Sequence, residues 1–176
     1  MANTAYIATS LDGYIARKDG GIDWLTEIPN PEQSDYGFSA FMERMDGIVM
    51  GRNTFELVQT FDPWPYDKPV FVLSRTLQEI PQKLQGKAEL VNGPPEKVLD
   101  SLRSRGMKHL YIDGGKTIQS FLQLDLIDAL IITRIPILLG SGIPLFAEMD
   151  REIRFELVRT EMLNKDLVKN TYVRKA

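Results

Sequence analysis

The sequence predicts a single α/β domain, residues 1–176, built on a mostly parallel sheet that ends in an antiparallel hairpin. Strand-like and helix-like segments alternate along most of the chain, which is typical of βαβ units with right-handed crossovers. Val70–Leu73 is a continuous apolar run, as expected of a parallel strand buried on both faces. The final segments, Phe155–Met162 and Leu167–Arg174, are both strand-like and have no helix between them. A length of 176 residues is typical of one domain.

The elements follow from local patterns in chain order. The first strand is expected to end at the Asp12-Gly13 turn signal. Ser34 can cap a helix that continues to about Met45, and Pro94-Pro95 opens a helix that Gly106 closes. The expected strands before the hairpin are Thr4–Thr9, Gly47–Met50, Val70–Leu73, His109–Ile112 and Ala129–Ile135. Two further short helices are expected at Asn53–Gln59 and Thr117–Leu122.

Composition excludes several kinds of chemistry. The chain has no Cys and one His, which excludes thiol catalysis, Fe–S clusters, Cys-ligated zinc and two-His metal sites, so no metal site is expected. The single His109 stands at a strand start, opposite the sheet edge where ligands bind, and is interpreted as structural. Lys and Arg total 21 against 24 Asp and Glu, a net charge of −3 that argues against nucleic-acid binding through bulk charge. If the protein is an enzyme, we expect a bound cofactor to carry the difficult chemistry.

Targeting and membrane signals are not expected. The N-terminus lacks a basic region, and its short apolar stretch soon meets Asp12. The most apolar segment, Ala129–Leu139, is interrupted by Arg134 and Pro136. That segment is shorter than the roughly 18 residues of a membrane span. We therefore expect a cytoplasmic protein without a membrane partner.

Three strand-to-turn junctions share one pattern, in which a buried strand is followed by a small residue, a cation and a Thr. Ligands of open α/β sheets bind at the carboxyl ends of the strands, and a helix N-terminus there favours anions. Each junction alone is compatible with a solvated turn, but three together predict a site for one polyanionic ligand, such as a dinucleotide with an extra phosphate. The junctions are Ile48–Thr54 with Arg52, Phe71–Thr76 with Arg75, and Leu110–Thr117 with Lys116. Leu110 replaces the first glycine of a P-loop, and no G-x-G-x-x-G fingerprint occurs.

Three side chains elsewhere have both a structural and a functional interpretation. Asp35, at the start of the helix expected from Ser34, can be a cap or a substrate-binding acid. Thr133 lies in an apolar strand and can be an ordinary β-branched strand residue. Trp24 can be a pocket wall or a core anchor. The Gly140-Ser141-Gly142 turn can cradle a substrate phosphate or simply be tight.

Five motifs in this order resemble the dihydrofolate reductase-like superfamily over nearly the whole chain. The chain is most similar to the reductase domain of the bifunctional riboflavin-biosynthesis deaminase/reductase, here in a stand-alone form. The motifs are Ala8–Ala16, Met50–Thr54, Val72–Thr76, Asp113–Gly115 and Ile135–Phe146. The resemblance implies a three-layer fold with helices on both faces of the sheet, an NADPH cofactor and a homodimer.

The resemblance also implies roles for individual residues on the cofactor side. Arg75 would pair with the 2′-phosphate of NADPH, because its planar fork suits a phosphate better than a ribose hydroxyl. Ala8 and Ile15 would lie against the nicotinamide. The remaining implied cofactor residues are Gly51, Arg52, Asn53, Thr54, Leu73, Ser74, Gly114, Gly115, Lys116 and Thr117.

On the substrate side, the resemblance implies that Asp35 contacts a small heterocycle and that Thr133 bonds to Asp35, with Trp24 in the pocket wall. Asp35 stands 16 residues before Gly51, since 51 − 35 = 16, as the substrate-binding acid does in dihydrofolate reductases. The implied reaction is hydride transfer to a C=N-type carbon, as in reduction of 5-amino-6-(5-phosphoribosylamino)uracil. Asp35 would either relay a proton or only orient the substrate.

Some features depart from the folate enzymes. The loop from Trp24 to Asp35 is longer, and Lys68 stands where those enzymes hold the glutamate tail of folate with Arg. The 138–146 segment is typical of the riboflavin-type branch. A dihydrofolate reductase, and an NADPH-binding protein without turnover, remain the alternative interpretations.

Overall fold

The computed structural model describes residues 1–175 and contains one eight-stranded sheet. The strand order is β5-β4-β3-β6-β1-β7-β10-β9, in which every neighbouring pair from β5 to β7 is parallel and β10 runs antiparallel to both of its neighbours. The strands of this sheet are β1 (Ala2–Thr9), β3 (Gly47–Gly51), β4 (Val70–Leu73), β5 (Ala88–Val91), β6 (His109–Asp113), β7 (Ala129–Arg134), β9 (Phe155–Met162) and β10 (Val168–Arg174). The predicted α/β class, parallel sheet and C-terminal hairpin are confirmed.

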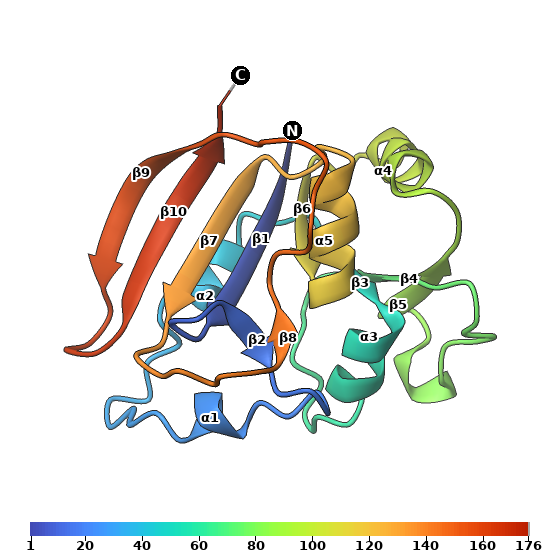
Figure 1. Ribbon diagram of the computed structural model, residues 1–176. Helices are drawn as coiled ribbons and strands as arrows, with labels where there is room; N and C mark the ends of the chain where they lie inside the picture. Colours follow the sequence, from blue (N-terminus) through green and yellow to red (C-terminus); the bar gives the residue numbers. More distant parts are fainter. Residues whose placement is uncertain (176) are drawn as a thin grey trace.

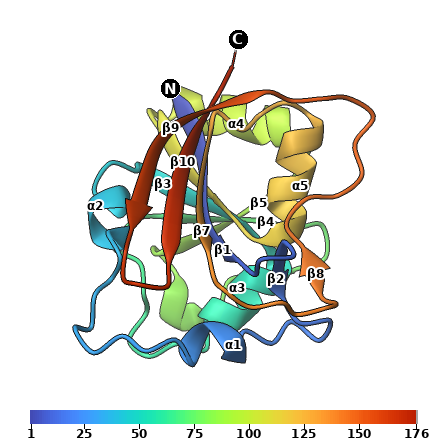
Figure 2. The same cartoon turned by 60° about the vertical axis from the view of Figure 1, so that its left-hand side comes forward.

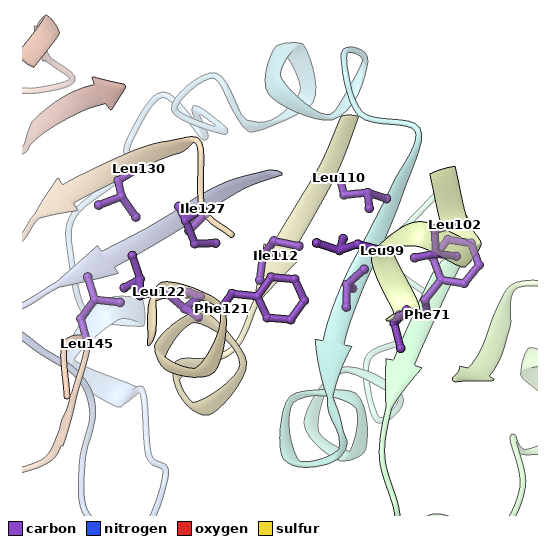
Figure 3. Close-up of a cluster of buried hydrophobic side chains, with 14 of the residues drawn as sticks. Phe71, Leu99, Leu102, Leu110, Ile112, Phe121, Leu122, Ile127, Leu130 and Leu145 are labelled. Atoms are coloured by element: carbon purple, nitrogen blue, oxygen red, sulfur yellow. The ribbon is translucent and has the colours of Figure 1, made fainter. Parts of the chain in front are cut away.

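Helices cover both faces of this sheet, which makes three layers (Figures 1 and 2). The helices are α1 (Asp23–Thr26), α2 (Phe38–Met42), α3 (Arg52–Val58), α4 (Pro95–Ser104) and α5 (Gly115–Gln123), with a 3₁₀ turn, η1, at Gln82–Leu84. Apolar residues of α4 and α5 pack in one core cluster, which Figure 3 shows around Leu99, Ile112 and Phe121. Apolar residues of α2 and α3 pack in a second cluster on the opposite face, around Phe41, Ile48 and Phe55.

Alternation along the strands explains how one sheet serves two cores. Ile112 of β6 points into the α4–α5 cluster, whereas its neighbour Tyr111 points into the α2–α3 cluster. The same alternation separates Val49 from Ile48 and Met50 in β3. Successive strand residues face opposite sides of a sheet, so a continuous apolar run satisfies both cores at once.

One predicted helix is shorter than expected. The segment from Ser34 to Met45 forms a helix only over Phe38–Met42, because Tyr36 and Gly37 have left-handed backbone angles, with φ of 53° and 84°. Such angles cannot continue a right-handed helix. Ser34 therefore lies outside the helix and is not its cap, which corrects the expectation.

Several short elements were not predicted. A separate two-stranded sheet joins β2 (Tyr14–Ala16) to β8 (Ile143–Pro144) in antiparallel fashion. The four-residue α1 and the edge strand β5 also carry too few residues to show a periodic pattern. The β2–β8 pair brings two segments far apart in sequence to one end of the main sheet (Figure 1).

Candidate functional site

The carboxyl ends of the parallel strands meet at one edge of the sheet. There β1 ends at Thr9, β3 at Gly51, β4 at Leu73 and β6 at Asp113. In Figure 1 this edge lies at the bottom of the molecule, where α1, β2 and α3 are gathered. The three junctions predicted to bind an anion therefore lie along a single edge.

The first and third junctions interlock through glycines. A Cβ atom on Gly51 would lie 2.8 Å from the hydroxyl of Thr117, and one on Gly114 would collide with the hydroxyl of Thr54. Gly114 also has a φ of 94°, which L side chains rarely adopt. The two loops approach so closely only because neither glycine carries a side chain.

The first and second junctions are joined by a hydrogen bond. Arg52 donates from Nη1 to the hydroxyl of Thr76 at 2.9 Å, while its Nε donates to Glu56 at 2.6 Å. The Ser74 hydroxyl accepts the backbone N–H groups of Thr76 and Leu77 at 3.2 and 3.0 Å. The loop after β4 is thus already folded into a turn.

The β2 segment lies over the third junction. A Cβ atom on Gly115 would collide with Cδ1 of Ile15 and would lie 3.7 Å from the side chain of Ile143. Ala8 is partly buried in a small cluster with Trp24 and Ile135. Ile15 therefore lies against the third junction, and Ala8 lies in the Trp24 cluster, one residue before the carboxyl end of β1.

Positive charge on this edge is available for a ligand. Arg75 and Lys116 are exposed and have no ion-pair partner within residues 1–175. The first backbone N–H groups of α5 follow directly after Gly114 and lack helical acceptors. Free cations and free N–H groups at one edge are the donors that phosphate groups require.

Asp35 is an exposed carboxylate that stabilises the entry to α2. Its Oδ1 accepts the N–H of Gly37 at 2.8 Å, and its Oδ2 accepts the N–H of Ser39 at 2.9 Å. The Ser39 hydroxyl, followed by these two backbone N–H groups, lowers the pKa of Asp35 to about 2. At neutral pH it is an acceptor that holds no proton to relay.

Within residues 1–175, the structure does not show the implied bond between Thr133 and Asp35. Thr133 is buried in β7, directly opposite Lys169 of β10. In the part of the chain that the structure describes, the side chain of Thr133 makes no hydrogen bond to Asp35, whose oxygens serve the turn before α2. The two residues are thus separate features, which corrects the paired arrangement expected from the sequence.

Of the two interpretations of Trp24, the structure supports the core anchor. Trp24 is 2% exposed and packs with Ile135 and Leu167, as a core anchor does. Its indole Nε1 is buried and has no hydrogen-bond partner among residues 1–175. The hydroxyl of Thr9 and the indole of Trp64 share this property, so it does not single out Trp24, and its role as a pocket wall stays a prediction.

Sequence reasoning missed a partly buried carboxyl at the same edge. Asp113 ends β6, and the Tyr66 hydroxyl donates to its Oδ2 at 3.4 Å. Burial raises the pKa of Asp113, while the hydroxyls of Tyr111 and Tyr66 act to lower it. Burial and the Asp113 charge raise the pKa of Tyr66 well above its usual range. The sequence offers one indication of Asp113, namely an acidic residue between a buried strand and Gly114-Gly115. The same pattern is typical of a solvated turn, so it does not single out Asp113.

The Gly140 turn is held by a carboxylate. Asp12 accepts the N–H groups of Leu139 and Gly140 at 3.1 and 2.7 Å. Those donors are occupied, and the negative charge beside them repels an anion. The tight-turn interpretation of Gly140-Ser141-Gly142 is therefore the one that this geometry supports.

A groove of about 1030 Å³ lies away from this edge, between α2 and the β9–β10 hairpin. Its lining includes Ala2, Thr4 and His109, from the amino-terminal ends of β1 and β6.

Over residues 1–175, no group of three or more His, Asp or Glu side chains is arranged to bind a metal ion. None of the helices in that range has the length and apolar character needed to cross a bilayer.

Comparisons with known proteins give a consistent picture. The family model described as RibD C-terminal domain matches residues 4–169. The crystal structure of a protein from Shewanella sp. PV-4 that is named as a riboflavin biosynthesis protein has a TM-score of 0.96 to this chain. The two sequences are 53% identical, and the match covers 100% of both chains. The uncharacterized protein YwjB of Bacillus subtilis strain 168 is 37% identical over 173 residues, 96% of this chain and 95% of that protein.

More distant structures share the fold. The Thermotoga maritima deaminase/5-amino-6-(5-phosphoribosylamino)uracil reductase is 16% identical with a TM-score of 0.74, covering 99% of this chain and 56% of that one. An Enterococcus faecalis dihydrofolate reductase complexed with NADP(H) is 18% identical with a TM-score of 0.68, covering 99% and 97% of the two chains. The dihydrofolate reductase-like fold expected from the motifs is confirmed.

Proposed function

This chain belongs to the RibD C-terminal domain family, and on that premise we propose that it is an NADPH-dependent reductase of a small heterocyclic substrate. The observation that carries the proposal is the interlocking of the three junctions at one sheet edge. Gly51 and Gly114 let the first and third loops pack directly against each other, and Arg75 and Lys116 supply positive charge that has no ion-pair partner within residues 1–175. This donor set fits the phosphates of a dinucleotide.

Different residues along the edge would bind the 2′-phosphate, the pyrophosphate and the nicotinamide of NADPH. Arg75 would bind the 2′-phosphate beside the preformed Ser74 turn, with Leu73 at the adenosine end. The pyrophosphate would lie on Gly114, Gly115, Lys116 and Thr117, and on the loop formed by Gly51, Arg52, Asn53 and Thr54. Ala8 and Ile15 would lie against the nicotinamide, which when bound supplies the hydride.

The substrate would lie between this edge and the loop that precedes α2. Asp35, ionised at neutral pH, would accept N–H groups of the heterocycle and orient it. Trp24 would support the pocket wall from the core cluster beneath it, and Thr133 would line the pocket from β7. Positioning of this kind can remove roughly 7–11 kcal/mol of a barrier.

Reduction of a C=N bond needs one proton on nitrogen for each hydride on carbon. Asp113 is the best-suited carboxyl at the edge, because its pKa is raised by burial whereas the pKa of Asp35 is lowered. An acid whose pKa lies nearer the working pH transfers protons more effectively. We assign the proton-donating role to Asp113 and the orienting role to Asp35.

The experiment follows oxidation of NADPH by the purified protein with two substrates. We expect turnover of 5-amino-6-(5-phosphoribosylamino)uracil, with one NADPH oxidised per ribitylamino product formed. Turnover of dihydrofolate alone would favour the folate alternative. Tight NADPH binding without oxidation of either compound would contradict the proposed reductase activity.

We also propose that the protein is a cytoplasmic homodimer that takes no nucleic-acid or membrane partner. Exposed apolar side chains gather on the terminal hairpin at Leu157, Val158, Met162 and Val173, which supports a subunit contact there. Light scattering coupled to size exclusion gives the mass directly. A monomer at micromolar concentration would contradict the dimer.

A further inference from the structure

Lys169 is an unusual residue for its position. It lies in β10 on the sheet face toward α2 and is 7% exposed, although it carries a charge. A buried ammonium is costly unless it is paired and hydrogen-bonded. Its contacts therefore indicate what this burial accomplishes.

The ammonium of Lys169 reaches across the sheet face to the loop before α2. Nζ donates to the backbone carbonyl of Tyr36 at 2.8 Å, in a residue 133 positions away in sequence. Glu161 of β9 lies 3.5 Å from Nζ and balances its charge, and the ring of Tyr6 has its centroid 5.9 Å away. A Cβ atom on Gly37 would lie 3.2 Å from Nζ, so Gly37 leaves room for the ammonium.

The same carbonyl receives a second bond from the sheet. The hydroxyl of Tyr6 donates to the Tyr36 carbonyl at 3.2 Å. Burial, with Asp35 and Glu161 nearby, raises the pKa of Tyr6 to about 12, so this hydroxyl keeps its proton at neutral pH. Two side chains from β1 and β10 thus converge on one loop carbonyl.

That carbonyl belongs to a strained turn. Tyr36 has a φ of 53°, an uncommon conformation for a residue other than glycine, which persists only where the surroundings hold it. On one side of Tyr36 stands Asp35, whose carboxylate accepts the Gly37 N–H. The side chain of Tyr36 packs against the Trp24 cluster. Tyr36 therefore connects the turn that contains Asp35 to the cluster that contains Trp24.

We propose that Lys169 is a positioning residue for the substrate site, because its ammonium, together with the Tyr6 hydroxyl, fixes the Asp35–Gly37 turn that presents Asp35 and buries Trp24. This inference rests on the proposed function for its link to catalysis. The geometry of the turn itself is independent of that function. Lys169 acts through Asp35 and contacts no reacting atom.

The test compares Lys169→Met with Tyr6→Phe. The first variant keeps the apolar stem and removes the charge, and the second removes the other bond to the same carbonyl. Lys165→Met, at the exposed tip of the same hairpin, is the matched control. We expect Lys169→Met to raise the KM for substrate about tenfold, with the Kd for NADPH and the NADPH-saturated kcat little changed. Tyr6→Phe should shift KM in the same direction by less, and Lys165→Met should leave it unchanged.

A second readout needs no turnover. In a Trp64→Phe background, Trp24 is the remaining tryptophan, and its emission reports the turn against which it packs. We expect Lys169→Met to shift this emission to longer wavelength and to increase its quenching by acrylamide at temperatures where the variant is folded. Tyr6→Phe supplies the same measurement if Lys169→Met does not fold.

The outcomes separate the two claims. Altered Trp24 emission in a protein that reduces no substrate would support the turn and overturn only the proposed function. Unchanged Trp24 emission in both variants would overturn the positioning role. If kcat and the affinity for NADPH fell while KM rose, the positioning role would also be overturned, since general destabilisation would then explain the effect.

Discussion

Arg52 donates from Nη1 to the hydroxyl of Thr76 at 2.9 Å and so ties the loop after β3 to the loop after β4. Because Arg75 lies in the loop after β4, this bond helps to fix the position of the Arg75 guanidinium. We expect Thr76→Val, which removes the acceptor and keeps the shape, to weaken NADPH binding by about 0.5–1.5 kcal/mol. NADPH titration by calorimetry measures this, and an unchanged affinity would show that the two loops act independently.

Gly114→Ala should destabilise the protein by roughly 2 kcal/mol and weaken NADPH binding. Gly114 has a φ of 94°, which is unfavourable for alanine, and the added methyl group would collide with the hydroxyl of Thr54. Gly106→Ala is the control, because Gly106 has a φ of 89° with no atom within 4 Å of the added Cβ. Urea unfolding should show a larger loss for Gly114→Ala, and equal losses would mean that the close approach of the loops is unimportant.

Asp35→Asn should change how stability depends on acid pH. The pKa of Asp35 is lowered in the folded protein to about 2, so its ionised form stabilises the fold above the usual carboxyl pKa of 3.8. That contribution is lost as the pH falls from about 4 through about 2. The variant should therefore show a shallower fall in the free energy of unfolding over this window. Identical slopes for both proteins would contradict the capping role.

Asp113→Asn should lower turnover about a hundredfold, as expected on loss of a general acid, while NADPH still binds. Burial raises the pKa of Asp113 in the folded protein, so the stability that protonation confers is present at acid pH and lost as pH rises through that pKa. The variant should lack this decline and be at least as stable as the wild type at neutral pH. A variant with full kcat would remove Asp113 from the reaction.

The sheet was largely predictable because its signals are local. Val70–Leu73 and Phe155–Met162 were predicted with the bounds that β4 and β9 have, since apolar runs and turn residues delimit them. The interruption of the helix expected from Ser34 was not predictable, because the left-handed turn at Tyr36 bonds through its carbonyl to Tyr6 and Lys169 from distant strands. The local sequence pattern around Ser34 does not indicate contacts with residues far away in the chain.

The candidate site was predictable in part for the same reason. Each junction shows its small residue and cation within a few positions, so Arg52, Arg75 and Lys116 could be singled out from the sequence. The environment of Asp113 depends on Tyr66, which is 47 positions away, and an acid beside glycines looks like any turn. The expected Thr133–Asp35 bond failed because the carboxylate of Asp35 bonds the backbone of its own turn instead.

Binding of NADPH and NADH to the wild type and to Arg75→Ala tests the central claim most directly. The wild type should bind NADPH at least about tenfold more tightly than NADH, because a guanidinium–phosphate pair is a strong, charge-assisted interaction. Arg75→Ala should lose most of this preference and leave NADH binding nearly unchanged. Equal affinities of the wild type for the two cofactors, or binding of neither, would contradict the assignment of this sheet edge to NADPH.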